Sequence, residues 1–193
     1  ARQFRPRTAA DMTARLAHPP IRPDWLALDR EEVIDPDLPI IDAHHHLFDR
    51  PGNRYLAPDY MADLTSGHNI IASVLMQARG FYRASGPELL YPVGETDHAA
   101  QVARQAELDG GPALCAAIVG HADLMLGAAV RPVLEAHVAA GQGRFRGIRH
   151  ILAWDSDARL LNPTYPTTED MMDSPAFIAG FAEPWHMNLT FDA

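Results

Sequence analysis

Short apolar runs alternate with helical patterns along most of this chain, and this alternation constrains the fold more than any other feature. The runs are rich in aliphatic and β-branched residues, and they recur at a spacing of roughly 30 to 40 residues. They lie at residues 39–44, 70–76, 113–120, 145–154 and 188–191. Such spacing is typical of βαβ units, and near-continuous apolar strands are typical of a parallel sheet covered on both faces. The sequence therefore predicts an α/β fold with five parallel strands.

Four segments between these runs carry apolar residues at helical spacing. They lie at residues 60–64, 95–108, 129–140 and 175–187. The third pattern is the clearest, because its apolar residues share one face and Gly141 follows its end. The fourth contains Pro184, and we expect that helix to bend or break there, since proline cannot donate the helical hydrogen bond.

The chain divides into an arm and a barrel-like region. Residues 1–38 are rich in Pro, Arg and Asp and hold one short helical pattern at residues 9–16. We interpret them as an N-terminal arm that packs on the domain through Trp25 and Leu26. Residues 39–193 hold the five predicted strands, whereas a closed (β/α)8 TIM barrel takes about 250 residues. We therefore expect a partial barrel with strands one to five, and a complete doubly wound domain of five strands is the alternative.

Composition narrows the classes of function. Of the 193 residues 47% are hydrophobic, which suffices for one sizeable core, and no apolar run reaches the about 20 residues of a membrane span. We see no signal-peptide pattern and expect a cytoplasmic protein without a membrane partner. The net charge of −9 disfavours nucleic acid as a partner. Cys115 is the single cysteine, so it cannot form an internal disulfide or a thiolate metal site. Because it lies inside an apolar run, we expect it to be a core residue.

Three consecutive histidines at the end of the first predicted strand are the strongest functional signal. Strand side chains alternate between faces, so His44 and His46 project the same way and could bind one divalent ion. His45 projects to the opposite face, where we expect a packing or supporting role. In β/α barrels the chemistry lies at the carboxyl ends of the strands, which is where this motif lies. The alternative is a cluster of loop histidines without a metal.

The segment Asp-Ala-His-His-His-Leu at residues 42–47, after an arm rich in Arg and Pro, resembles the first-strand motif of the amidohydrolase superfamily. The likeness is to its amidohydrolase-2 branch, which includes hydrolases of sugar lactones and of aromatic-breakdown lactones as well as metal-dependent decarboxylases. Later segments resemble the same branch, and they lie at residues 69–78, 118–123, 146–150 and 189–193. The resemblance is closest to the lactonase-like members and covers about the first two-thirds of such an enzyme.

This resemblance implies a metal-dependent hydrolase that acts on a small-molecule lactone, a related cyclic ester or a carboxylate. It assigns His44 and His46 as the paired first-strand ligands of a divalent metal, with zinc expected and manganese or a metal-free route as alternatives. The family's other ligands follow strand five, often strand six, and strand eight, where an Asp serves as general base; we expect these positions beyond this sequence. A non-oxidative decarboxylase and a non-catalytic truncated β/α domain are the alternative functions.

Further polar residues follow the other predicted strands and are candidates for binding substrate. Arg149, at the end of the fourth strand, could hold a substrate carboxylate in a bidentate fork or could pair with an acidic neighbour. Gln77 follows the second strand, and His121 closes the third. We expect His150 to lie on the face opposite Arg149. Open strand edges in a partial barrel would also favour pairing with another chain, so a homo-oligomer is expected.

Overall fold

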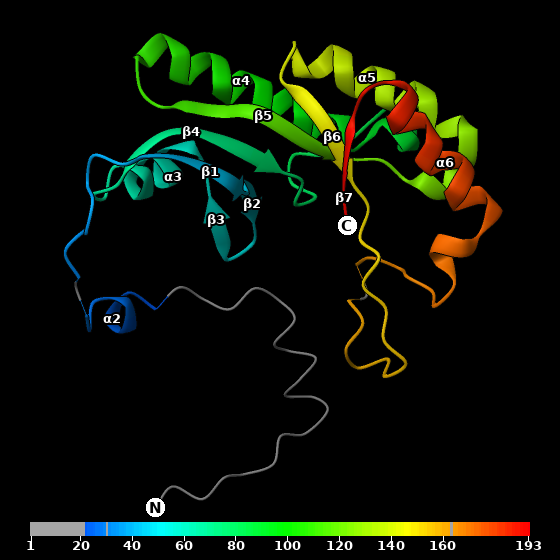
Figure 1. Ribbon diagram of the computed structural model, residues 1–193, viewed down its shortest axis with the longest axis horizontal. Helices are drawn as coiled ribbons and strands as arrows, with labels where there is room; N and C mark the ends of the chain where they lie inside the picture. Colours follow the sequence, from blue (N-terminus) through cyan, green and yellow to red (C-terminus); the bar gives the residue numbers. More distant parts are fainter. Residues whose placement is uncertain (1–21, 30, 163) are drawn as a thin grey trace, which may run out of the picture.

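A five-stranded parallel sheet forms the centre of the molecule in the computed structural model, which describes residues 22–29, 31–162 and 164–193 (Figure 1). Its strands lie in the same order as in the sequence. They are β1 (Pro39–His45), β4 (Asn69–Met76), β5 (Ala113–His121), β6 (Phe145–Arg149) and β7 (Thr190–Asp192). This confirms the predicted α/β class and the five parallel strands. The doubly wound alternative is wrong, because such a sheet reverses its strand order at a switch point.

Helices connect the strands, and Figure 1 shows α4, α5 and α6 along the convex side of the curled sheet. The four main helices match the predicted segments to within three residues at either end. They are α3 (Ala57–Leu64), α4 (Val93–Asp109), α5 (Arg131–Gly141) and α6 (Pro175–His186). Local signals set their ends: the Ser174 hydroxyl accepts the Phe177 N–H at the start of α6, and Gly110 follows α4 in the left-handed conformation. The described helices include none that is long and apolar enough to cross a membrane.

The smaller elements lie in the connections. A hairpin of β2 (Phe48–Arg50) and β3 (Asn53–Tyr55) follows β1. The one-turn helix α2 (Pro23–Leu26) precedes β1. Three 3-10 helices complete the described structure, and they are η1 (Glu88–Leu90), η2 (Leu124–Val130) and η3 (Met171–Asp173).

Four expectations from the sequence are corrected. Strand β6 ends at Arg149 rather than near residue 154, because the chain leaves the sheet there in a long loop before η3. Helix α6 does not break at Pro184 and continues to His186. The sheet is not covered on both faces throughout, because Ile41 and Ile71 are 59% and 47% exposed. The arm was expected to pack on the domain through Trp25 and Leu26, and it does not.

Trp25 and Leu26 of α2 are 58% and 60% exposed. Both side chains remain largely in solvent, so the described part of the arm does not bury them against the domain. The helical pattern expected at residues 9–16 lies outside the described residues.

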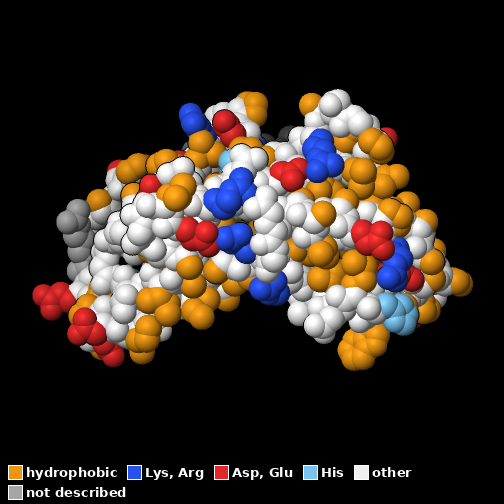
Figure 2. All heavy atoms as spheres, turned by 90° about the horizontal axis from the view of Figure 1, so that it is seen from above, with side chains coloured by type: hydrophobic (Ala, Val, Ile, Leu, Met, Phe, Trp, Pro, Cys, Tyr) orange, Lys and Arg blue, Asp and Glu red, His pale blue; other side chains and the backbone are white. Residues whose placement is uncertain are grey.

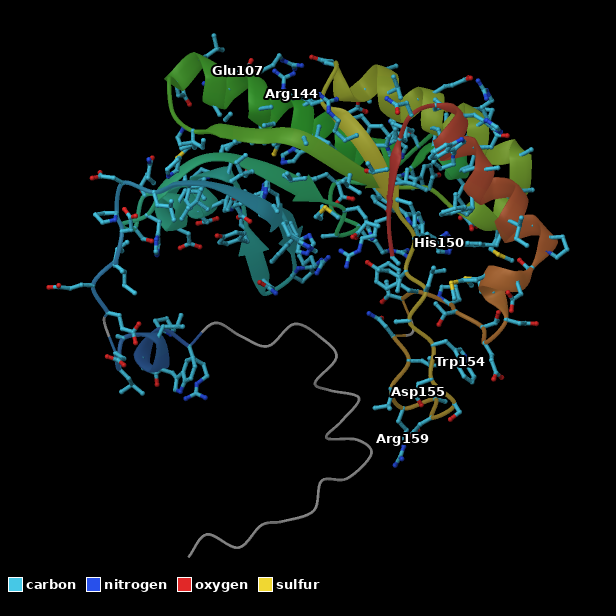
Figure 3. All side chains as sticks on the ribbon, viewed as in Figure 1. Glu107, Arg144, His150, Trp154, Asp155 and Arg159 are labelled. Atoms are coloured by element: carbon cyan, nitrogen blue, oxygen red, sulfur yellow. The ribbon has the colours of Figure 1, made fainter. Side chains whose placement is uncertain are left out.

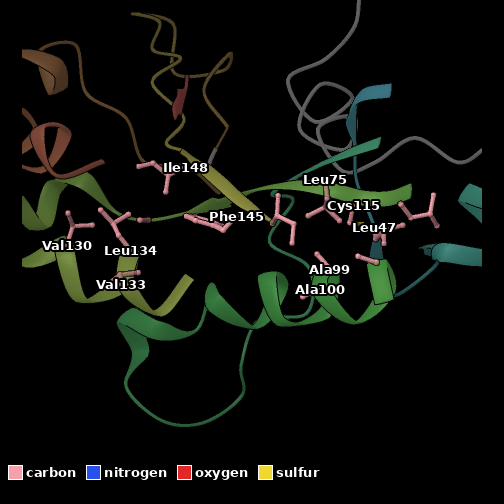
Figure 4. Close-up of a cluster of buried hydrophobic side chains, with 14 of the residues drawn as sticks. Leu47, Leu75, Ala99, Ala100, Cys115, Val130, Val133, Leu134, Phe145 and Ile148 are labelled. Atoms are coloured by element: carbon pink, nitrogen blue, oxygen red, sulfur yellow. The ribbon is translucent and has the colours of Figure 1, made fainter. Parts of the chain in front are cut away.

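The core lies between the sheet and its helices (Figure 4). It contains Leu75, Ala99, Cys115, Leu134 and Ile148, all buried. Cys115 is thus a buried core residue, as predicted, and burial raises the pKa of its thiol to about 12. The core joins α4 and α5 to the strands, and it holds the carboxyl ends of those strands in a fixed arrangement.

One buried histidine ties three elements together within this layer. The Thr96 hydroxyl donates to His137 Nδ1 at 2.8 Å, and the His137 Nε2–H donates to the His121 carbonyl at 2.9 Å. Gly120 makes this approach feasible, because a Cβ there would lie 2.9 Å from His137 Cε1. The hydrogen bonds therefore fix α4 and α5 to the end of β5.

The outer surface of the helical layer carries charges of both signs among hydrophobic side chains (Figure 2). Glu107 of α4 and Arg144 form an ion pair there, and Figure 3 shows the two side chains facing each other. Arg131 of α5 pairs with Glu135 of the same helix and with Glu183 of α6. Of these pairs, only Arg131–Glu183 joins two helices, and at the surface each pair contributes little stability.

Candidate metal centre

The carboxyl ends of the five strands form one edge of the sheet, and polar side chains gather along it. His121, Arg149 and Asp192 are in register at the ends of β5, β6 and β7. At the other side of this edge, β1 ends in the histidine motif and β4 is followed by Gln77. Chemistry-bearing residues from all five strands therefore share the edge at which α/β proteins place their sites.

His44 and His46 come together at the end of β1. Their Nε2 atoms lie 3.2 Å apart, and their rings are nearly perpendicular at 89°. A β-bulge contributes to this arrangement, because Asp42 pairs with Ser73 and His45 with Leu75, which leaves one extra residue on β1. The His44 N–H donates to Asp42 Oδ1 at 3.1 Å within the bulge. The prediction that the two rings project the same way is confirmed.

The ring of His46 is oriented by the neighbouring strand. Its Nδ1 lies 2.8 Å from the Met76 carbonyl oxygen, which can only accept, so Nδ1 carries the hydrogen and Nε2 keeps a lone pair. Burial lowers the pKa of His46, and the charges of His44, Arg149 and Arg50 lower it further against the Met76 hydrogen bond. A neutral imidazole with a backbone partner on its far nitrogen is the form in which histidine binds metals.

The separation of the two Nε2 atoms fits one tetrahedral ion. Two nitrogens at about 2.0–2.1 Å from such an ion stand about 3.3–3.4 Å apart, close to the observed 3.2 Å. Within the described part of the chain, no group of three or more His, Cys, Asp or Glu side chains could hold a metal. The described residues therefore offer two imidazole ligands in suitable geometry, and no third His, Cys, Asp or Glu among them completes the group.

His45 turns away from its neighbours and packs against α3. Its ring stacks on Tyr60, and its Nδ1–H donates to the Val74 carbonyl at 2.9 Å. Its Nε2 lies 3.7 Å from Cys115 Sγ. Burial lowers the pKa of His45 to about 4, so the ring is neutral at neutral pH. The expected packing role is confirmed.

A pocket of about 540 Å³ lies along β1, next to the hairpin and α3. Both His44 and His46 line it, together with the aromatic rings of Phe48, Tyr55 and Tyr60. Phe48, Tyr60, Asp63 and His68 also line this pocket, and the sequence did not predict them as parts of the site. The helical pattern at residues 60–64 predicts the helix that carries Tyr60 and Asp63, but only the fold places that helix beside the end of β1 and next to Phe48 and His68.

The structure places the two candidates of β5 and β6 as follows. Arg149 Nε lies 3.1 Å from Asp192 Oδ2 in an ion pair, which is the acidic-neighbour alternative considered from the sequence. The His121 Nδ1–H donates to the Arg149 carbonyl at 3.0 Å, which leaves its Nε2 as an acceptor. His150 is buried beside Phe177 of α6 and accepts the Leu124 N–H, so it lies toward the helices. Substrate binding by Arg149 and His121 stays a prediction.

Gln77 is only 1% exposed, and neither of its side-chain amide atoms has a hydrogen-bond partner among the described residues. Its backbone N–H donates to the Val119 carbonyl at 2.9 Å and so continues the pairing of β4 with β5. The side chain therefore does not reach solvent at this edge, and its role in binding substrate stays a prediction.

Arg79 connects two loops at the same edge. Its Nη1 donates to the Thr164 carbonyl at 2.8 Å, and its guanidinium lies 5.6 Å from the Tyr165 ring centroid and 5.9 Å from that of Tyr82. Figure 3 shows the loop after His150 extending away from the sheet through Trp154, Asp155 and Arg159. Tyr165 was missed in the sequence because it lies far from Arg79 along the chain.

Comparison with known proteins adds no relative to this picture. No protein-family model matches the chain, and neither a curated protein nor a solved structure does. Membership of the amidohydrolase superfamily therefore stays a prediction from the motif.

Proposed function

We propose that this chain is the front part of a (β/α)8 amidohydrolase-like barrel, a metal-dependent hydrolase that opens a lactone or a related cyclic ester. The observation that supports this best is the pair of His44 and His46 Nε2 atoms, 3.2 Å apart at the carboxyl end of the first strand. The curled sheet with strands in sequence order supports the barrel. A cytoplasmic location belongs to the same proposal.

A divalent ion held by this pair, with zinc the expected one, would lower the pKa of a bound water toward about 7 and polarise the lactone carbonyl. Residues of this chain would hold the ion in the required geometry. His44 and His46 present their Nε2 atoms, and the Met76 carbonyl holds the His46 ring in the required tautomer. The general base implied by the resemblance is an Asp after strand eight.

The pocket beside the pair supports a small cyclic substrate. Its volume of about 540 Å³ lies within the range of about 300–1,000 Å³ that is typical of small-molecule sites. Phe48 and Tyr55 contribute aromatic residues to its lining, and His44 and His46 line the same pocket. A ring bound there would place its carbonyl near the two imidazoles.

Metal binding tests the first half of the proposal. Purified protein is titrated with Zn²⁺ by calorimetry and with Co²⁺ by visible absorption, which reports imidazole ligation. We expect one ion per chain and a loss of affinity of tenfold or more in His44→Ala and in His46→Ala. His186→Ala, an exposed histidine on α6, is the matched control. Binding that survives in the double variant would contradict the proposed site.

Hydrolysis tests the second half. This chain, and a longer form that includes the downstream sequence, are assayed against a panel of sugar and aromatic lactones with and without chelator. We expect ring opening that is lost with the chelator, restored by Zn²⁺ and abolished in His44→Ala. Unchanged turnover in His44→Ala would indicate a metal-free route, and CO₂ release from a carboxylate would indicate a decarboxylase. Metal binding without turnover would indicate a non-catalytic domain.

A further inference from the structure

Glu95 is a buried carboxylate that the proposed chemistry does not use. It lies in the first turn of α4 and is 3% exposed. Its Oε1 accepts the backbone N–H of Ala78 at 2.8 Å and of Gly80 at 3.0 Å, and its Oε2 has no hydrogen-bond partner among the described residues. Burying a carboxylate is unfavourable unless hydrogen bonds compensate, and here the compensating bonds come from the backbone of one loop.

The loop that Glu95 contacts has a backbone that needs restraint. Arg79 and Phe81 have φ angles of 58° and 54°, in the left-handed region that non-glycine residues seldom adopt. Gly80 lies so close to the end of β1 that a Cβ there would be 2.8 Å from the Leu47 carbonyl oxygen. Such conformations persist where surrounding contacts hold them, and the Glu95 bonds at Ala78 and Gly80 flank Arg79.

The same loop joins the candidate metal centre to a second loop. It begins directly after Met76, whose carbonyl oxygen orients His46, and Arg50 of β2 donates to the Ala78 carbonyl. In the other direction, Arg79 contacts Thr164 and Tyr165 in the loop after β6. The peptides held by Glu95 therefore lie between His46 and the outer loop.

We propose that Glu95 is a positioning residue that holds residues 77–83 in place and thereby fixes the Met76 carbonyl that orients His46. The first half of this proposal, that Glu95 holds residues 77–83 in place, concerns the loop alone. The second half, the effect on His46, rests on the proposed metal-dependent function. Glu95 itself contacts neither the histidine pair nor a substrate.

Hydrogen exchange of the Ala78 and Gly80 amides tests the first half. In Glu95→Ala these amides lose their acceptor, and we expect exchange at least tenfold faster than in the wild type, with the amides of α5 unchanged. Glu95→Gln keeps an amide oxygen as acceptor and should restore most of the protection. Glu107→Ala, at the exposed end of the same helix, is the matched control. Unchanged exchange in Glu95→Ala would overturn the proposal.

Glu95→Asp keeps the test decisive if the alanine variant does not fold. Its carboxylate is shorter by one methylene and cannot reach both amides, so we expect faster exchange at Ala78 and Gly80 in a folded protein. Exchange as slow as in the wild type would count against Glu95 as the restraint.

The affinity for Co²⁺ tests the second half. We expect it to fall severalfold in Glu95→Ala, to recover in Glu95→Gln and to stay unchanged in Glu107→Ala. Faster loop exchange with unchanged affinity would overturn the link to His46. If the wild type binds no ion, the proposed function fails, whereas the exchange measurement still decides whether Glu95 holds the loop.

Discussion

The imidazole ring of His45 lies flat on the phenol ring of Tyr60, with centroids 4.0 Å apart and planes 7° from parallel. The hydroxyl of the same tyrosine donates to Asp42 Oδ2 at 2.6 Å. Tyr60 of α3 thus contacts two residues of β1 that flank the bulge. These contacts turn the middle histidine inward and leave His44 and His46 to face each other.

Removing the Tyr60 hydroxyl should destabilise the protein. In Tyr60→Phe the ring stack remains, but Asp42 loses a partner, and we expect a loss of about 1–2 kcal/mol in the free energy of unfolding. Urea denaturation followed by circular dichroism measures it. Tyr91→Phe is the control, since its hydroxyl makes no hydrogen bond with a described residue. Equal losses in both variants would show that the Asp42 bond contributes nothing.

Stability should fall on mild acidification because two buried histidines resist protonation. Burial lowers the pKa of both His45 and His137 to about 4, whereas the value for an unperturbed histidine is 6.5. The unfolded chain therefore takes up protons first, and stability is lost as the pH falls from 6.5 toward 4. Urea midpoints across this range measure the decline.

The variant His137→Gln isolates one part of that decline. Whatever its own stability, its curve should fall less steeply between pH 6.5 and 4, because one of the two groups is gone. His186→Gln, which changes an exposed histidine, should leave the slope as it is. A slope unaffected by the loss of His137 would show that this ring does not stay neutral in the folded protein.

The titration of Glu95 should make the protein less stable as the pH rises, which is opposite to the effect of the two histidines. Burial raises its pKa from 4.5 to about 7, although the N–H groups of Ala78 and Gly80 and the charge of Arg50 oppose the rise. Tyr82 faces the same carboxylate, and burial raises the pKa of this phenol, which therefore stays neutral. The unfolded chain releases the Glu95 proton first, so raising the pH from 4.5 to 7 destabilises the fold.

The variant Glu95→Gln has no titrating carboxyl at this position, so comparison with the wild type gives the contribution of Glu95 to the pH dependence of stability. Relative to the wild type, the variant should gain stability between pH 4.5 and 7, by at most about 3 kcal/mol, and the difference should then level off. The measurement is the difference between the two unfolding free energies at each pH. Two parallel curves would refute the assigned titration.

A methyl group at Gly147 should disturb the pairing of β6 with β7. A Cβ there would lie 2.1 Å from Thr190 Oγ1 and 2.5 Å from the Thr190 carbonyl oxygen, which is backbone and cannot move aside cheaply. We expect Gly147→Ala to lose about 1–3 kcal/mol and to expose the β7 amides to exchange. Gly111→Ala is the control, because its nearest contact would be Met61 Cε at 3.5 Å. Protected β7 amides in Gly147→Ala would contradict the close packing.

Much of the secondary structure could be read from local patterns. Five strands and four helices appear where apolar spacing placed them, and the alternation of strand side chains was enough to separate His45 from His44 and His46. Strand β6 was predicted too long, because the apolar pattern continues past Arg149 although the chain there leaves the sheet. Periodicity reports which face is apolar, and it does not report whether a neighbouring strand is present.

The candidate site was predictable only in part. The histidine pair could be found because both ligands lie in one short segment. Three other contacts could not be predicted, because each joins residues far apart along the chain. They are the ion pair of Arg149 with Asp192, the stack of His45 on Tyr60 and the hydrogen bonds of Glu95. Local sequence determined which strand carries the imidazoles and that His45 lies on the face opposite His44 and His46. Only tertiary packing decided the bulge partners, the pocket and the buried carboxylate, since distances between distant residues arise when the elements pack together.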